Sequence, residues 1–252
     1  MDKVIEIYKN DNHILNDAID RIIVEVYSRR KKDGIKTIAL TGCGSGNGTT
    51  TSAINISLAL AIAGWKTILI DCDIRKGSLY KRLNNEVVTG LSDYITYKDT
   101  YQIKDVVYRT NTEKLYYLPC GHLNDNPIRL LCSARMEELV EKLRNEYDYI
   151  IFDLPSITIM ADADILFPIV DGIILVAALN ITTKKQLYIA REKVKKFSDK
   201  YHGLIVNKVD MNQYRKYNKD FDYFNEKNLK KKYKNLVSKH YSTGEKYDKE
   251  ND

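Results

Sequence analysis

A glycine-rich loop between two apolar segments is the feature that most narrows what this chain can fold into. The segment 37–41 is short and apolar, and the sequence then runs T-G-C-G-S-G-N-G-T-T-T-S from Thr41 to Ser52. Because glycine has no Cβ, the four glycines of this loop let the backbone turn its N–H groups toward an anion. A helix that starts near Thr49 adds the positive end of its dipole. The loop therefore predicts a phosphate-binding turn between a strand and a helix.

The loop departs from the strict phosphate-loop motif. Thr49 stands where G-x-x-x-x-G-K-[ST] has its lysine, and Cys43 stands where it has its first glycine. No dinucleotide-binding G-x-G-x-x-G register fits either, so a glycine-rich turn without a ligand stays open as an alternative. The hydroxyl of Thr50 or Thr51 is suited to Mg²⁺. The residues predicted to surround the phosphates are Gly44, Ser45, Gly46, Asn47, Gly48, Thr49, Thr50 and Thr51.

Strand-like and helix-like segments alternate along the middle of the chain. The strand-like segments are 37–41, 67–71, 114–118, 149–153, 172–178 and 204–207, and the helix-like segments lie near 50–63, 134–146, 162–168 and 182–198. Several of the strands are apolar on both faces, which is typical of a parallel sheet covered by helices. We therefore expect an α/β fold with a doubly wound, mostly parallel sheet, in which ligands bind beyond the carboxyl ends of the strands.

Acidic residues stand at the ends of two of these strands. Asp71 ends the segment 67–71 and Asp73 follows two residues later, and Asp153 ends the segment 149–153. One such Asp alone is more often a helix cap or a turn residue. Several beside a glycine loop indicate carboxylates placed where Mg²⁺ sits next to a nucleotide. Asn207 ends the last strand and has an amide suited to a purine edge, although a turn residue is the simpler interpretation.

The chain divides into three predicted parts. Residues 1–34 carry one apolar stripe from Ile14 to Tyr27 and a basic end before Gly34, which predicts an amphipathic helix packed on the sheet. Residues 35–210 form the sheet domain. Residues 211–252 lose the apolar periodicity and predict a basic, tyrosine-containing tail that is disordered apart from one marginal helix near 225–238.

Composition excludes several classes of protein. The 252 residues contain no apolar run long enough to cross a membrane, and the N-terminus lacks the pattern of a signal peptide. The four cysteines show no metal-binding or redox spacing, so we expect reduced thiols and a cytoplasmic location. The net charge of +6 comes mostly from the tail. A nucleic-acid binder more often carries its excess on a folded face, so we expect no nucleic-acid partner.

Taken together, these motifs resemble the bacterial tyrosine kinases (BY-kinases) of capsular and exopolysaccharide systems, a branch of the Min/Par-like P-loop ATPases. The resemblance covers about 35–210. The segments that carry the resemblance are GSGNGTTTSAIN, ILIDCDIRKGSLYKRL with Asp71, Asp73 and Arg75, GLSDYI, the Asn126-Pro127 element with Leu130, Leu131 and Ser133, YDYIIFDLPS with Asp153 and Pro155, DGIILV and IVNKVD.

The resemblance implies a P-loop NTPase-like fold and a set of roles. ATP and Mg²⁺ would occupy the loop, with Thr50, Asp71 and Asp153 at the metal. Asp73 would accept the proton of a substrate tyrosine, and Asn207 would face adenine. Members of the family phosphorylate their own tail tyrosines, usually between neighbours in a ring. They are switched on by the cytoplasmic tail of a membrane protein that controls polysaccharide chain length, which implies work at the inner face of the plasma membrane.

The chain also departs from the family pattern, and the departures leave three functions open. Thr49 replaces the lysine, Arg129 replaces a Glu, Ala178 replaces an Arg, and the N-terminal ring motif is not recognisable. Losing a transition-state donor slows a reaction by about 10²–10³-fold. Arg75, Lys76 or Lys208 are candidates for a substitute cation. The chain is thus expected to be a tyrosine kinase, a non-catalytic nucleotide-binding regulatory subunit, or a Min/Par-like ATPase.

Overall fold

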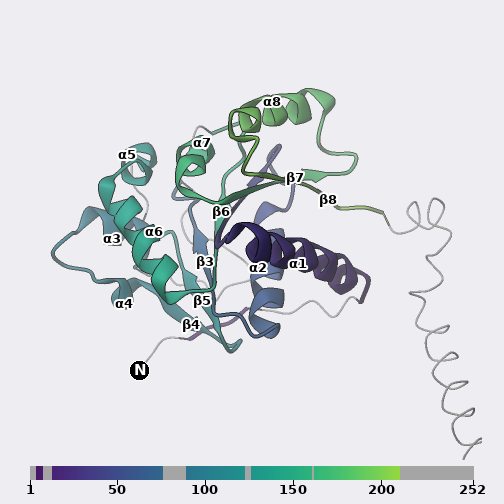
Figure 1. The fold of residues 1–252 in the computed structure, drawn as a ribbon. Coiled ribbons are helices and arrows are strands. Elements are labelled where there is room, and N and C mark those ends of the chain that lie inside the picture. Colours follow the sequence, from purple (N-terminus) through teal and green to yellow (C-terminus); the bar gives the residue numbers. More distant parts are fainter. Residues whose placement is uncertain (1–3, 8–12, 76–88, 123–125, 161, 211–252) are drawn as a thin grey trace, which may run out of the picture. The chain divides into compact units, whose positions relative to one another are not determined.

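An eight-stranded sheet with helices on both faces forms the body of the molecule (Figure 1). The computed structural model describes residues 4–7, 13–75, 89–122, 126–160 and 162–210. The strand order is β1-β4-β5-β3-β6-β2-β7-β8, and all pairs are parallel except β4 with β5. The strands are β1 (Val4–Ile5), β2 (Thr37–Gly42), β3 (Thr67–Asp71), β4 (Tyr108–Thr110), β5 (Leu115–Leu118), β6 (Tyr149–Leu154), β7 (Gly172–Ala178) and β8 (Tyr201–Asn207).

Eight α-helices are found in the described part of the chain. They are α1 (His13–Asp33), α2 (Thr49–Ile62), α3 (Leu91–Thr96), α4 (Ile103–Val106), α5 (Pro127–Leu131), α6 (Ala134–Glu146), α7 (Asp162–Leu166) and α8 (Lys184–Val194). Short 3₁₀ turns, Phe167–Ile169 and Lys195–Phe197, follow α7 and α8. None of the helices in these ranges combines the length and the apolar character needed to span a bilayer.

Successive side chains of a strand point to opposite faces of the sheet. Because consecutive residues of the central strands are apolar, both faces of the sheet are apolar. In β6, Ile150 and Phe152 belong to one buried cluster, whereas Tyr149 and Ile151 belong to the other. The first cluster includes side chains of α3, α6, α7 and α8, and the second includes those of α1 and α2. This two-sided burial is the reason that the central strands read as continuous apolar segments, and it confirms the predicted α/β fold.

Helix α1 packs on the second face, as its apolar stripe predicts. Val26 is buried, and the ring of Tyr27 lies 6.1 Å from that of Trp65. The guanidinium of Arg30 lies 4.8 Å from the centre of the Tyr149 ring. The helix ends just before Gly34, whose φ of 73° lies in the left-handed region that favours glycine. The N–H of Gly34 donates to the carbonyl of Arg30 at 2.9 Å.

The structure adds elements that the sequence pattern does not show. β1 and β4 are short strands at or near one edge of the sheet, and the helices α3, α4 and α5 have four to six residues each. The predicted helix 182–198 consists of α8 and a 3₁₀ turn. The residues before 35 also contribute β1 to the sheet. The tail expected at 211–252, with its helix near 225–238, lies outside the described residues.

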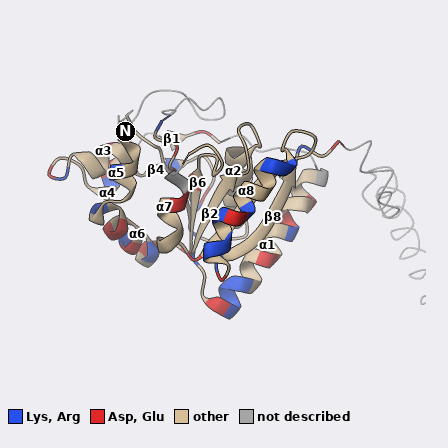
Figure 2. Cartoon of the chain, turned by 90° about the horizontal axis from the view of Figure 1, so that it is seen from above, with Lys and Arg blue, Asp and Glu red and all other residues tan. Residues whose placement is uncertain are grey.

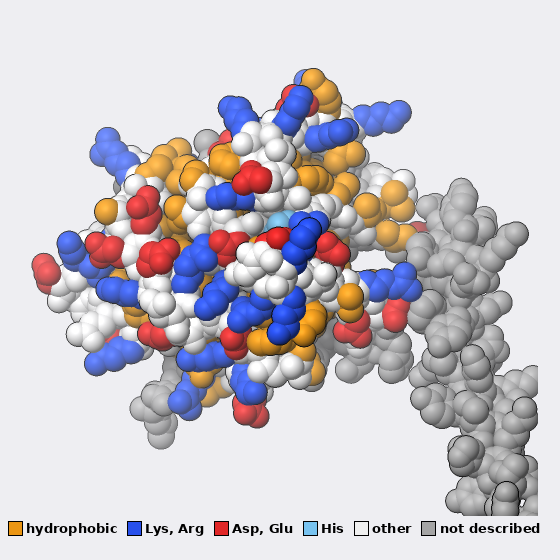
Figure 3. Space-filling model, in the orientation of Figure 1, with side chains coloured by type: hydrophobic (Ala, Val, Ile, Leu, Met, Phe, Trp, Pro, Cys, Tyr) orange, Lys and Arg blue, Asp and Glu red, His pale blue; other side chains and the backbone are white. Residues whose placement is uncertain are grey.

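Among the described residues, 4–7 and those from Leu15 to Lys208 belong to one compact unit, and 13, 14, 209 and 210 are grouped in a second. Within the first unit, charged residues are concentrated on helices such as α1, α6 and α8, and the strands contain few (Figure 2). Basic and acidic groups are interspersed over the face seen in Figure 3. Exposed apolar side chains also occur on this unit, among them Ile181, Tyr188 and Val206.

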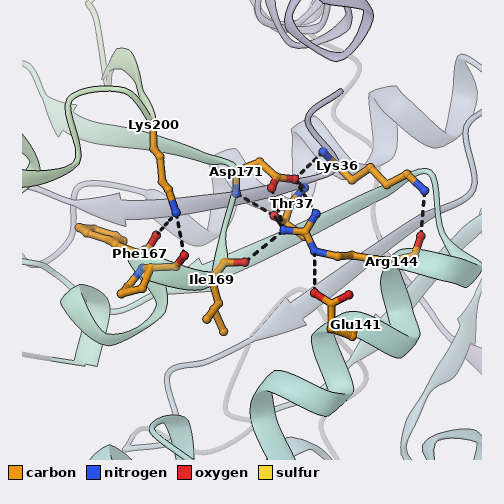
Figure 4. Close-up of polar contacts among 9 residues, drawn as sticks. Lys36, Thr37, Glu141, Arg144, Phe167, Ile169, Asp171 and Lys200 are labelled. Atoms are coloured by element: carbon orange, nitrogen blue, oxygen red, sulfur yellow. Dashed lines mark hydrogen bonds and ion pairs between the residues drawn. The ribbon is translucent and has the colours of Figure 1, made fainter. Parts of the chain in front are cut away.

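A network around Arg144 ties α6 to the amino-terminal edge of the sheet (Figure 4). Its guanidinium donates to both oxygens of Asp171, at 2.9 and 2.7 Å, and to the Thr37 hydroxyl at 2.9 Å. The Asp171 carboxylate also accepts from the backbone N–H groups of Lys36 and Thr37, at 2.8 and 2.9 Å. Burial tends to raise the pKa of Asp171, but these donors outweigh burial and lower the pKa below its ordinary value.

The network predicts a loss of stability when one partner is removed. Arg144→Met leaves the Asp171 carboxylate half-buried without its main partner, so we expect urea unfolding at pH 7 to show a loss of about 3 kcal/mol. Glu141→Gln is the control, because that carboxylate is 76% exposed and lies 3.6 Å from Arg144 Nε. The account is wrong if both variants unfold at the same urea concentration as the native protein.

The same network predicts a pH dependence. Because folding lowers the pKa of Asp171, its ionisation stabilises the fold above the unfolded-state pKa, and this contribution is lost as pH falls through the lower folded-state value. The stability difference between the native protein and Asp171→Asn should therefore shrink as pH falls from 6 to 3. A difference that stays constant over this range, followed by urea unfolding, would contradict the assignment.

Candidate functional site

The glycine-rich loop joins the end of β2 to the start of α2, which begins without a side-chain cap. Gly46 and Gly48 have φ of 70° and 84°, a backbone conformation that favours glycine. Gly48 is the N-cap of α2, and no side chain caps the helix. The first N–H groups of a helix lack partners within it and bind anions readily. The loop therefore has the form predicted for a phosphate site.

Neighbouring strands hold this loop in place. The N–H of Cys43 donates to the carbonyl of Val176 in β7 at 2.8 Å. The N–H of Ile157 donates to the carbonyl of Gly42 at 3.0 Å, and the Thr158 hydroxyl donates to the carbonyl of Cys43 at 2.9 Å. The loop is thus fixed from the β7 side and from the segment after β6.

Asn207, at the end of β8, makes a further connection to the loop. Its Nδ2 donates to the backbone carbonyl of Asn47 at 2.9 Å, and its Oδ1 accepts the N–H of Lys208 at 2.8 Å. A Cβ on Gly48 would overlap Asn207 Nδ2. Asn207 therefore links β8 to the loop. Its predicted contact with adenine stays a prediction.

The three acidic residues lie together at the carboxyl ends of β3 and β6. Asp71 and Asp153 are paired in the register of the two strands, and Asp73 follows two residues after Asp71. All three are nearly buried, with 3, 2 and 6% of the residue exposed for Asp71, Asp153 and Asp73. The Asp73 N–H donates to Asp71 Oδ1 at 2.9 Å. The structure thus brings together the carboxylates that the sequence placed at two separate strand ends.

Because these carboxylates are buried, their ionised forms are unfavourable unless a positive charge lies nearby. Burial raises the pKa of Asp71 from 3.8 to about 6, and the negative charge of Asp73 adds to the rise, although the Asp73 N–H and the Tyr117 hydroxyl oppose it. Burial and the neighbouring carboxylates also raise the pKa of Cys72 and of Tyr117. A divalent cation beside Asp71 would favour its ionised form.

A cavity of about 540 Å³ opens over the loop. Its volume lies within the range of about 300–1,000 Å³ that is typical of ligand pockets. It is lined by the loop residues Gly44 to Thr51, by Asp73, Arg75 and Lys208, and by Leu154, Pro155, Ser156, Ile159 and Met160. The cavity therefore joins a polar, amide-rich floor to a partly apolar wall, as a nucleotide requires.

The residues present fit a nucleotide with its metal ion. Asn47 is 1% exposed, and neither polar atom of its side chain has a hydrogen-bond partner among the described residues. Such a buried, unsatisfied amide is uncommon and indicates a missing partner at the cavity. No cluster of three or more His, Cys, Asp or Glu suited to a metal occurs in the ranges described. Mg²⁺ needs only one or two carboxylates when nucleotide phosphates complete its shell.

The structure sorts the predicted site residues into two groups. Gly44, Ser45, Gly46, Asn47, Gly48, Thr49, Thr50, Thr51 and Asp73 line the cavity, whereas Asp71, Asp153 and Asn207 are not among its lining residues. The sequence prediction missed the wall formed after β6, including Ile159 and Met160. The only clue was that this segment directly follows a strand ending in Asp153.

The contact between Gly48 and Asn207 predicts a difference between two glycine substitutions. Gly46→Ala and Gly48→Ala both place a Cβ at positive φ, but the new Cβ meets nothing within 4 Å at Gly46 and overlaps Asn207 at Gly48. We expect left-handed strain of about 1–2 kcal/mol in both variants. Gly48→Ala should lose about 1 kcal/mol more, because the Asn207–Asn47 hydrogen bond is displaced.

Urea unfolding of the two variants measures this difference, and Asn207→Ala provides the control background. In that background the two glycine substitutions should cost the same, because the overlapping amide is gone. Equal losses in the native background would show that Asn207 does not restrain the loop.

Comparisons with known proteins identify the family of this chain. A family model described as an AAA domain matches residues 35–204. The chain is 34% identical over 180 residues to the tyrosine-protein kinase CpsD of Streptococcus pneumoniae serotype 4, and the match covers 71% of this chain and 78% of that protein. It is 32% identical over 149 residues to CpsD of Streptococcus agalactiae and spans 64% of that relative.

Solved structures show the same fold. The kinase domain of the Escherichia coli tyrosine kinase ETK has a TM-score of 0.71 at 22% identity, covering 77% of this chain and 75% of that chain. The septum site-determining protein MinD of Pyrococcus horikoshii, complexed with Mg-ADP, has a TM-score of 0.55 at 23% identity, covering 68% and 69%. By its match to the AAA-domain model and to CpsD, this chain belongs to the P-loop family of bacterial tyrosine kinases.

Proposed function

We propose that the chain is an ATP-dependent protein-tyrosine kinase that phosphorylates tyrosines of its own C-terminal segment and regulates capsule or exopolysaccharide synthesis. The observation that carries this proposal is the buried group of Asp71, Asp73 and Asp153 beside an amide-rich loop and a nucleotide-sized cavity. The CpsD relatives, which are named tyrosine-protein kinases, support the choice of reaction.

The proposed roles follow from position. The loop amides from Gly44 to Thr51 would hold the phosphates, and the hydroxyl of Thr50 with the carboxylates of Asp71 and Asp153, at the strand ends behind the cavity wall, would hold Mg²⁺. When bound, the ion would supply positive charge beside the transferred phosphoryl group. Asp73, on the cavity wall, accepts the proton of the attacking tyrosine hydroxyl. The bond from the γ-phosphorus to the bridging oxygen of ADP breaks as the bond to the tyrosine oxygen forms, so ADP leaves and phosphotyrosine remains.

The domain roles are part of the same proposal. Residues 35–210 act as the kinase domain, and residues 211–252 supply the substrate tyrosines, which are Tyr214, Tyr217, Tyr223, Tyr233, Tyr241 and Tyr247. The activating partner is the cytoplasmic tail of a membrane-embedded chain-length co-polymerase, so that the chain works at the inner face of the plasma membrane. Exchange of phosphate between copies would need a homo-oligomer.

Thr49 favours a second candidate function. The Thr49 side chain is short and uncharged, and its Oγ1 lies 2.7 Å from the place that a Cβ on Gly42 would take, at the base of the loop. Without the lysine, the loop retains its amides for binding but lacks one donor in the transition state. A nucleotide-binding regulatory subunit without kinase activity is therefore the competing proposal.

Phosphotyrosine mass spectrometry of the full chain with Mg-ATP, with and without the co-polymerase tail, separates the two. The kinase proposal expects slow labelling of tail tyrosines that is abolished in Asp73→Asn and increased about 10²-fold in Thr49→Lys. Labelling seen only in Thr49→Lys would make the native chain the regulatory subunit. Steady phosphate release with no labelled tyrosine would instead favour an ATPase of the Min/Par type.

A further inference from the structure

We propose that Lys208 supplies the nucleotide phosphates with the positive charge that Thr49 does not carry. This inference rests on the proposed nucleotide site and assigns a role to a residue of its wall. The loop segment from Gly42 to Ser52 contains no Lys or Arg. Among the residues that line the cavity, Arg75 and Lys208 are the basic ones.

The backbone of Lys208 is attached to the loop through a single side chain. The Lys208 N–H donates to Asn207 Oδ1 at 2.8 Å, and Asn207 Nδ2 donates to the carbonyl of Asn47 at 2.9 Å. This chain of two hydrogen bonds fixes the start of the lysine side chain relative to the phosphate loop. A fixed start lowers the conformational entropy that a long side chain loses when it binds.

Lys208 also adopts a backbone conformation that is uncommon for a lysine. Its φ is 56°, and the other non-glycine residues with positive φ in the described ranges are Lys114 and Asn180. The left-handed region costs a non-glycine residue about 1–2 kcal/mol. Such outliers cluster at ligand clamps, where the surrounding structure holds them in place. At Lys208 the left-handed turn keeps the residue on the cavity wall as the chain leaves β8.

The strand order places the two basic residues on opposite sides of the loop. Lys208 follows β8, which is separated from β2 by β7, whereas Arg75 comes shortly after β3, which is separated from β2 by β6. Arg75 therefore lies on the side of Asp71, Asp73 and Asp153. Lys208 lies on the side without these carboxylates and is connected through Asn207 to the backbone of Asn47. The side-chain amide of Asn47 is buried and has no hydrogen-bond partner among the described residues. These contacts assign the missing charge to Lys208.

The test compares two nucleotides and a matched pair of variants. Calorimetry or competition binding measures the affinity of the full chain for Mg²⁺ with the nonhydrolysable triphosphate AMP-PNP, and for AMP. Lys208→Met should weaken AMP-PNP binding about 10- to 100-fold, the loss of one charged hydrogen bond, and leave AMP within twofold. Lys114→Met is the control, because Lys114 also has positive φ but its Nζ donates to the carbonyl of Gly64 at 3.0 Å.

A second substitution tests whether a lysine at position 49 can replace the positive charge of Lys208 at the nucleotide phosphates. Thr49→Lys in the Lys208→Met background should restore AMP-PNP affinity to within a few-fold of the native chain. The inference is overturned if Lys208→Met binds AMP-PNP as the native chain does, if AMP and AMP-PNP weaken equally, or if Arg75→Met alone shows the loss. A native chain that binds neither nucleotide would overturn the nucleotide site itself, which is a different result.

Discussion

Parallel pairing of β3, β6, β2, β7 and β8 is the constraint on which the rest of the molecule depends. Parallel strands present their carboxyl ends at one edge of the sheet, and here that edge receives the acidic ends of β3 and β6, the glycine loop after β2 and Asn207 at the end of β8. Residues that are more than 150 positions apart in the chain, such as Asn47 and Asn207, thereby form one site. The two apolar faces, covered by helices, hold the strands in this arrangement.

The opposite edge of the sheet, where the strands begin, is held together by polar contacts that stabilise the fold. There the hydrogen bonds of Arg144 to Asp171 and Thr37 join the starts of β2 and β7 to α6, and these donors lower the pKa of Asp171. At the site edge the balance is reversed, because buried carboxylates are left in surroundings that raise the pKa of Asp71 to about 6. A group that is unfavourable for folding and lies at a cavity is typical of a functional site.

Much of the fold could be predicted, because buried parallel strands appear in the sequence as continuous apolar segments. The glycine-rich loop between the first strand and the next helix indicated a turn that can bind phosphate. β1 and β4 could not, since two- and three-residue strands depend on a neighbour that forms elsewhere in the chain. At the site, the acidic strand ends and the loop were visible as residue types. The role of Asn207 was not, because a hydrogen bond to Asn47 depends on the strand order, which leaves no pattern in the sequence. The apolar wall at Ile159 and Met160 was missed for the same reason.

The family resemblance and the geometry together leave one physical question, which is whether loop amides can hold a triphosphate without a lysine of their own. A crystal structure of the chain with Mg²⁺ and a nonhydrolysable ATP analogue answers it most directly. The account predicts phosphate oxygens within hydrogen-bond distance of the backbone N–H groups between Gly44 and Thr51, and a metal ion contacted by Thr50. Crystals in which the cavity stays empty at saturating analogue, or in which the phosphates lie away from these amides, would contradict it.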